Sequence, residues 1–125
     1  MSNIMAVLQN GIAQIEYNRD KFLPDHQQLY LDKMDEKMNT GILIDNVLIE
    51  NPEPEQRLRF VAGNLANAIK SGDEPMVAAL CAYLASRQPE LKQVKIEDVE
   101  GGISIDLVYD EVYLNQIGVQ FNALH

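Results

Sequence analysis

The chain has 125 residues, close to the commonest domain size, and 46% of them are hydrophobic, which supports one self-sufficient core and argues against disorder. Its formal net charge at pH 7 is −9, and all ten Lys and Arg residues lie at or before Lys95. Residues 96–125 therefore carry six acidic side chains and no Lys or Arg. A field of one sign repels nucleic acid and favours basic partners.

Cysteine content and hydropathy indicate the cellular compartment in which we expect the chain. Cys81 is the only cysteine, so the chain forms no internal disulfide, and nothing in its cysteine usage indicates an oxidising compartment. Residues 1–4 lack the basic start and long apolar run of a secretory signal. No apolar stretch approaches the roughly 20 residues that span a bilayer. We therefore expect one soluble, cytoplasmic domain over residues 1–125, with no membrane partner.

Residues 4–22 are predicted to form an amphipathic helix, because apolar side chains recur there at helical spacing. Gly11 is expected to weaken it by about 1 kcal/mol relative to Ala. Pro24 ends this helix, and Asp25 with Gln28 suits a capping box for a second helix that closes at residues 39–41. The apolar positions of the two helices are Ile4, Leu8, Ile12, Ile15 and Phe22, then Tyr30, Leu31, Met34 and Met38.

Residues 42–50 fit more than one structure. The runs Ile-Leu-Ile and Val-Leu-Ile flank Asp45 and Asn46, and their β-branched content favours a buried strand. A helix is one alternative, and two very short strands joined by a tight turn at Asp45-Asn46 are another. We expect a strand.

A pair of helices is predicted over residues 52–88. Asn51 suits the N-cap, with Pro52 at the first helical position, and the first helix ends at Ser71-Gly72. Asp73 caps the second helix, which is apolar on most sides and stops at Pro89. The short link predicts an antiparallel helical hairpin at the centre of the fold.

The hydrophobic period then changes from 3.6 to 2, which predicts a β-hairpin over residues 94–109. A Gly101-Gly102 loop would set Glu97 opposite Asp106, a pair of like charges. A four-residue loop over residues 99–102 instead sets Lys95 opposite Asp106, Ile96 opposite Ile105 and Val94 opposite Leu107. We expect the second register, because it pairs opposite charges.

Residues 110–125 carry apolar side chains at helical spacing after Asp110-Glu111, although residues 119–123 alternate like a strand, so a helix that breaks near Gly118 is the alternative. The expected fold is therefore α+β. It has about four helices with a central antiparallel helical hairpin, and a C-terminal antiparallel β-hairpin or small sheet.

Residues for nucleophilic catalysis are scarce. Such catalysis needs an activated Ser, Cys or Thr and usually a histidine base. The two histidines are His26, in the first turn of a predicted exposed helix, and His125, the last residue. Cys81 lies among alanine and leucine residues, where a buried thiol is inert packing. We expect no catalytic residue of this kind.

The sequence also gives no motif for a metal, a cofactor or nucleic acid. Asp106, Asp110 and Glu111 lack the spacing of a calcium loop, and no phosphate-binding or dinucleotide motif occurs. The second helix of the pair has one basic residue, Arg87, and is too apolar to read a DNA groove. We expect no cofactor, no metal site and no direct nucleic-acid partner.

Tyr109 and Tyr113 flank Asp110-Glu111, and aromatic anchors inside an acidic rim are typical of an interface hot spot. We predict a non-enzymatic interaction or regulatory protein that engages a basic protein surface through its acidic hairpin face. The alternative is a small enzyme or ligand-binding protein that uses Asp106 or Asp110 in a pocket between helices and sheet. Homo-oligomerisation is left open. The predicted partner-binding residues are Glu97, Asp106, Asp110, Glu111 and Tyr113.

Overall fold

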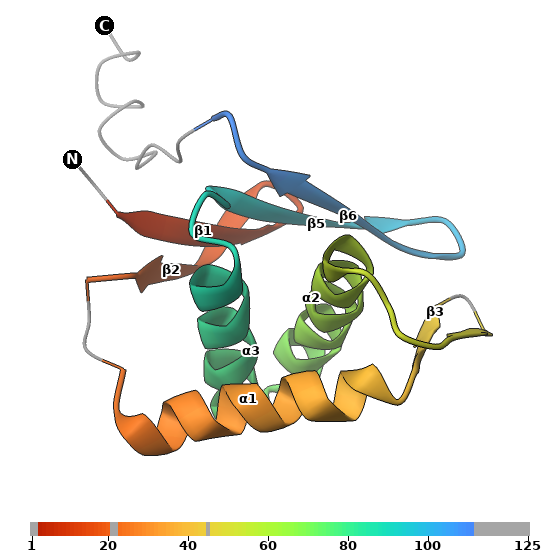
Figure 1. Cartoon of the computed structure of the whole chain (residues 1–125). Coiled ribbons are helices and arrows are strands. Elements are labelled where there is room, and N and C mark those ends of the chain that lie inside the picture. Colours follow the sequence, from red (N-terminus) through yellow and green to blue (C-terminus); the bar gives the residue numbers. More distant parts are fainter. Residues whose placement is uncertain (1–2, 21–22, 45, 112–125) are drawn as a thin grey trace, which may run out of the picture.

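The computed structural model describes residues 3–20, 23–44 and 46–111. One face of a four-stranded sheet packs on two helices, and a third helix crosses beneath them (Figure 1). A separate two-stranded hairpin projects to one side (Figure 1). In chain order the elements are β1 (Ile4–Gln9), β2 (Ile12–Asn18), α1 (Asp25–Asn39), β3 (Ile42–Ile44), β4 (Val47–Ile49), α2 (Pro54–Ser71), α3 (Glu74–Arg87), β5 (Gln93–Val99) and β6 (Gly102–Val108).

The expected fold of about four helices with a central helical hairpin is wrong, although the α+β class holds. The described residues form three helices and six strands, and the four-stranded sheet is mixed, in the order β2-β1-β5-β6. Strands β1 and β5 pair in parallel at its centre, and Met5, Ala6 and Val7 of β1 are fully buried. The predicted C-terminal helix, with its alternative strand, lies largely in residues 112–125, outside the described ranges.

The main error concerns residues 4–22, which form the antiparallel β1–β2 pair instead of a helix. Asn10 and Gly11 make the turn with φ of 51° and 83°, the positive values that a two-residue hairpin turn requires. Asn-Gly is a strong hairpin signal, and it outweighs an apolar spacing that also fits a helix. A bulge interrupts the register between Val7 and Leu8.

Helix α1 begins where the sequence predicts, but its expected capping box is absent. Pro24 is the N-cap, and the Gln28 side chain donates instead to the main-chain oxygen of Leu23 at 2.9 Å. After α1, Ile44 of β3 pairs with Val47 of β4, and Asn46 between them has a φ of 66°. The alternative of two very short strands is therefore confirmed over the single strand that we expected.

The helices predicted over residues 52–88 correspond to α2 and α3, whose buried residues supply much of the core. The first cap differs from the prediction, because Glu53, not Asn51, is the N-cap of α2 and forms a capping box with Gln56. Asp73 caps α3 as predicted and accepts a hydrogen bond from the main-chain nitrogen of Met76. In the chain, both helices fall between β1 and β5, and in space they pack against the sheet. They thus form part of the long crossover connection that parallel pairing of β1 with β5 requires.

The predicted register of the C-terminal hairpin is confirmed. Strand β5 pairs with β6 so that Lys95 lies opposite Asp106, Ile96 opposite Ile105 and Val94 opposite Leu107. The turn is tighter than the four residues expected, because residues 99 and 102 still pair. Gly101 accommodates this turn with a φ of 87°.

Candidate protein-binding surface

Glu97 and Asp106, two of the predicted acidic residues, lie on the side of the four-stranded sheet that faces away from α2 and α3, which we call the outer face. Val94 and Ile96 are buried in the core beneath the sheet, so the alternating residues Lys95 and Glu97 point to the outer face. Because Asp106 lies directly opposite Lys95, it shares this face. Glu97 and Asp106 are both exposed and are diagonal neighbours on this face, because Glu97 pairs with Ser104 and Asp106 with Lys95.

Glu111 reaches the same face through contacts that the sequence did not reveal. The side chain of Gln93, which is buried, donates a 2.8 Å hydrogen bond to the main-chain oxygen of Glu111. The Lys95 ammonium lies 3.7 Å from the Glu111 carboxylate. The chain after β6 therefore turns back over β5, and Lys95 offsets part of the charge of Asp106 and Glu111.

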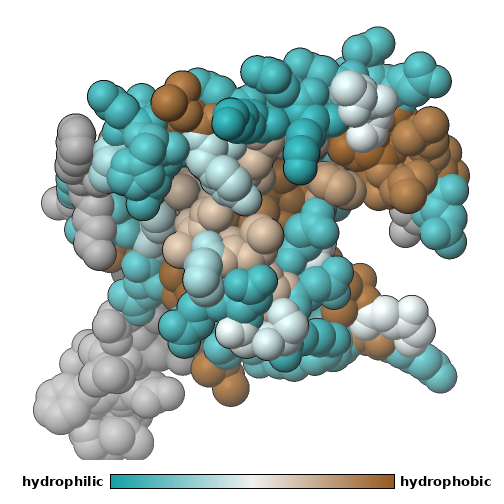
Figure 2. Space-filling view, turned by 90° about the horizontal axis from the view of Figure 1, so that it is seen from below, coloured by the Kyte–Doolittle hydropathy of each residue, from teal (hydrophilic) through white to brown (hydrophobic). Residues whose placement is uncertain are grey.

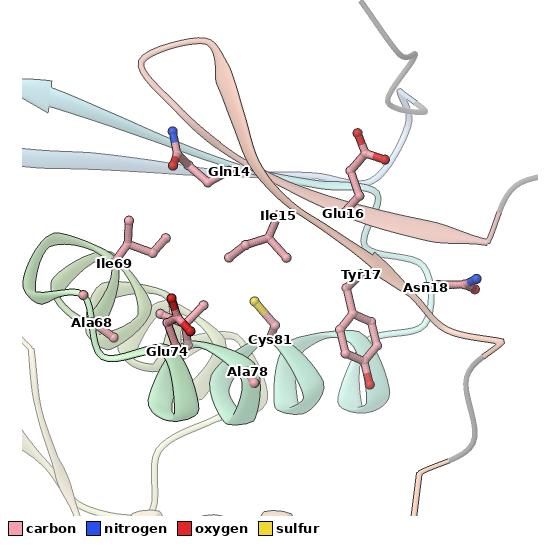
Figure 3. Close-up of a pocket in the computed structure, with 12 residues that line it drawn as sticks. Gln14, Ile15, Glu16, Tyr17, Asn18, Ala68, Ile69, Glu74, Ala78 and Cys81 are labelled. Carbon is pink, nitrogen blue, oxygen red and sulfur yellow. The ribbon is translucent and has the colours of Figure 1, made fainter.

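A fourth acidic side chain, Glu16, comes from the other end of the chain. Strand β2 alternates, so that Ile15 and Tyr17 point towards α3 while Glu16 points away from the helices (Figure 3). Glu16 pairs with Ala6 of β1, and Ala6 pairs on its other side with Gln93 of β5. The helix predicted over residues 4–22 gave no reason to place Glu16 with the other acidic residues. The Asn10-Gly11 turn signal would have placed Glu16 on a strand.

The acidic face is thus defined by Glu16, Glu97, Asp106 and Glu111, with Lys95 among them. Asp110 is exposed beside it, immediately after β6. Tyr109, one of the two aromatic residues that flank Asp110-Glu111, is 37% exposed. Tyr113 lies outside the described residues.

The nearby carboxylate of Asp98 has a different role, in holding elements together. It accepts a 3.0 Å hydrogen bond from the Asn10 side chain and lies 3.0 Å from the Lys70 ammonium. Its main-chain nitrogen donates to the Asn10 oxygen at 2.9 Å. The hydrogen bonds from Asn10 and Lys70 lower the pKa of Asp98. Asp98 thereby links the β1–β2 turn to β5 and α2.

A second polar cluster, far from the acidic face, joins α1 to the other helices. Asp35 of α1 accepts hydrogen bonds from the Tyr83 hydroxyl and, at 2.9 Å, from Arg87 Nε. The Arg57 guanidinium approaches the Asp35 carboxylate at 3.6 Å. Arg87 also pairs with Asp32 at 2.9 Å. Because the two arginines are matched by two aspartates, this cluster is structural in character and has no surplus charge for a ligand.

A pocket of about 560 Å³ lies between β2 and helices α2 and α3. Cys81 points from α3 towards Ile15, and Tyr17 lies beside it (Figure 3). Burial raises the pKa of the Cys81 thiol to about 12, so the thiol stays protonated and weakly nucleophilic near neutral pH. Neither Asp106 nor Asp110 lines this pocket. The two aspartates of the alternative hypothesis are therefore not brought together in it.

Two apolar features lie on the helical side of the molecule. A groove of about 550 Å³ between the helices is lined by Met34, Met38, Phe60 and Met76, among others. The β3–β4 hairpin gathers hydrophobic side chains at the right of the view in Figure 2, where Leu43 and Leu48 form an exposed cross-strand pair. Both features are separate from the acidic face, because they lie on other elements.

Within the described ranges, no cluster of three or more His, Cys, Asp or Glu side chains is arranged to hold a metal ion. In the same part of the chain, no helix combines the length and the apolar character needed to cross a membrane. Comparisons with protein-family models, with curated proteins and with solved structures found no match to this chain.

Proposed function

We propose that this protein is a non-enzymatic interaction or regulatory protein that binds a basic surface of a partner protein through its acidic face. One observation carries the proposal. Four exposed carboxylates from separate parts of the chain, Glu16, Glu97, Asp106 and Glu111, share the outer face of one sheet, with Lys95 as the basic side chain among them. Asp110, and Tyr113 in the undescribed segment, extend the proposed binding site along the chain.

The expected physical behaviour follows from this charge pattern. Complementary charge raises the rate of association and sets the orientation of the partner, and salt screens both effects. The carboxylates are exposed, so each one contributes little alone. The partner should therefore bind by the summed field of the face, and its affinity should fall as salt concentration rises.

The placement of Asp106 supports this proposal over the enzyme or ligand-binding alternative. Asp106 is exposed on the outer face, whereas the pocket between sheet and helices is lined by β2, α2 and α3 residues. A general base works best where burial or neighbouring groups tune its pKa. Cytoplasmic location stays a prediction.

A capture experiment tests the proposed function. The wild-type protein and a Glu97→Gln/Asp106→Asn variant would be used to capture binding proteins from a lysate of the source cells at low and high salt. We expect a basic partner that wild type retains at low salt, that high salt releases, and that the variant retains at least tenfold less well. The substitutions keep side-chain size and remove two negative charges.

A matched control is Glu36→Gln/Glu90→Gln, which removes two exposed negative charges from elements other than the sheet. This variant should capture the partner as well as wild type does. Equal loss in both variants would mean that net charge alone attracts the partner, and that the acidic face has no specific role.

A further inference from the structure

The two edges of the four-stranded sheet are protected to different degrees. Strand β2 forms one edge, and the bulge between Val7 and Leu8 disturbs its pairing with β1. Strand β6 forms the other edge and pairs with β5 through seven consecutive residue pairs without a bulge. It contains no proline. Bulges and prolines are the usual devices that prevent further pairing, so β6 is the more open edge.

The hydrogen bonds of β5 determine which main-chain groups of β6 face this open edge. The main-chain nitrogen of Asn10, just after β1, donates to the oxygen of Ile96, so Ile96 and, by alternation along β5, Val94 direct their main-chain groups towards β1. Residues 93, 95, 97 and 99 therefore point towards β6 and bond with their partners there. In β6, Ile103, Ile105 and Leu107 alternate with the residues that bond to β5. These three residues therefore direct their main-chain N–H and C=O groups away from β5, towards the open edge.

Side chains on the two faces of β6 differ in the same alternating order. Ile103, Ile105 and Leu107 are half-buried against the core on the helical side. Ser104 and Asp106 are exposed on the outer face. A strand added antiparallel to β6 would form close, non-hydrogen-bonded pairs with Ser104 and Asp106, where facing side chains approach most closely.

We propose that β6 is a strand-addition edge that takes an extended segment of the basic partner, in which apolar residues alternate with Lys or Arg. The apolar residues lie beside Ile103, Ile105 and Leu107, and a basic residue faces Asp106. The inference rests on the proposed function and specifies how the partner is recognised. A second copy of this chain is a poorer occupant, because each copy carries a net charge of −9 and presents its own Asp106 at this edge.

The test uses an acetylated and amidated nine-residue peptide of alternating Lys and Val, titrated into the isotope-labelled protein and followed by amide NMR signals. In the antiparallel arrangement the Val amides face β6 and the Lys amides face solvent. N-methylation of the Val residues should weaken binding at least tenfold, because it removes the donors to β6. Methylation of the main-chain nitrogens of the Lys residues leaves the side-chain charges unchanged and should weaken binding less than threefold.

Hydrogen exchange of the protein amides, compared with and without the peptide, is a second readout. Binding should slow the exchange of the Ile103, Ile105 and Leu107 amides. An Ile105→Pro substitution removes the central outward N–H from an edge position where proline is tolerated, and should weaken peptide binding at least tenfold. The control Ile105→Val keeps the N–H and should bind as wild type does. Thermal unfolding of both variants checks that they fold.

Outcomes separate this inference from the proposed function. Equal binding of the two N-methylated peptides would show that charge holds the peptide and that the β6 edge does not, which overturns strand addition while the proposed function stands. No salt-dependent binding of the parent peptide also overturns strand addition. The proposed function is judged independently by the capture experiment, which uses no peptide.

Discussion

Individual residues in positive-φ positions determine where this chain turns. Asn10, Gly11 and Asn46 adopt φ values of 51°, 83° and 66°, and each lies between two strands that pair. Glycine adopts such values without steric cost, whereas Ala does not. The same residue type in a helix has the opposite effect, since Gly63 within α2 lowers helix stability.

Gly11→Ala and Gly63→Ala should therefore change stability in opposite directions. Gly11→Ala should lower the free energy of unfolding by about 1–2 kcal/mol, because Ala is strained at a φ of 83°. Gly63→Ala should raise it by about 1 kcal/mol, because a Cβ there meets no atom within 4 Å. Urea unfolding of both variants measures the two changes. Stabilisation by Gly11→Ala would instead agree with a helix over residues 4–22.

At the scale of elements, single polar side chains join segments that are distant in sequence. The guanidinium of Arg19, just after β2, donates to the main-chain oxygens of Ala85, Gln88 and Leu91 at 3.0, 3.0 and 2.6 Å. These oxygens lie at and beyond the C-terminal end of α3, where carbonyl groups lack partners within the helix. Arg19 thus fastens the end of β2 to the end of α3.

Arg19→Ala should lower the free energy of unfolding by about 2–3 kcal/mol, because it leaves partly buried carbonyl groups without a charged donor. Arg19→Lys should recover only part of the loss, since an ammonium lacks the planar fork of donors. Arg59→Ala is the matched control, because Arg59 is exposed on α2, and it should change stability by less than about 0.5 kcal/mol. Equal effects at both arginines would contradict this role of Arg19.

For the whole molecule, the cluster around Asp35 determines how α1 is held against the other two helices. Burial, and then the hydrogen bond to Asp35, raise the pKa of Tyr83 well above its ordinary value of 10.0. A raised pKa means that the protonated phenol stabilises the folded state. This contribution is complete below pH 10 and is lost as pH rises from there towards the pKa of the folded protein.

We therefore expect the stability of the wild-type protein to fall as pH rises above about 10, and to fall less steeply in Tyr83→Phe. Urea unfolding of the two proteins from pH 8 to pH 11 measures this difference in slope. The Tyr109→Phe variant is the control, because its side chain is partly exposed at the end of β6. Parallel curves for wild type and Tyr83→Phe would show that this phenol does not control alkaline unfolding.

The sequence alone determined the features that depend on neighbouring residues. The extents of α1, α2 and α3 follow approximately from apolar spacing over a few turns and, for α3, from the Asp73 cap. The pairing of Lys95 with Asp106 follows from period-2 alternation and local charge. The α+β class and the positions of Glu97 and Asp106 on one strand face were accessible for this reason, and Glu111 was predicted as a binding residue from its place in the acidic C-terminal segment.

Only the tertiary structure decided the rest, because local spacing does not specify pairing between distant segments. The Asn10-Gly11 turn signals a hairpin within residues 4–22, but its place at the centre of the sheet depends on the parallel pairing of Ala6 with Gln93, which no local pattern specifies. That contact brings Glu16 onto the outer face, and Gln93 then holds Glu111 there. The acidic face is thus assembled from both ends of the described chain by the central β1–β5 pair.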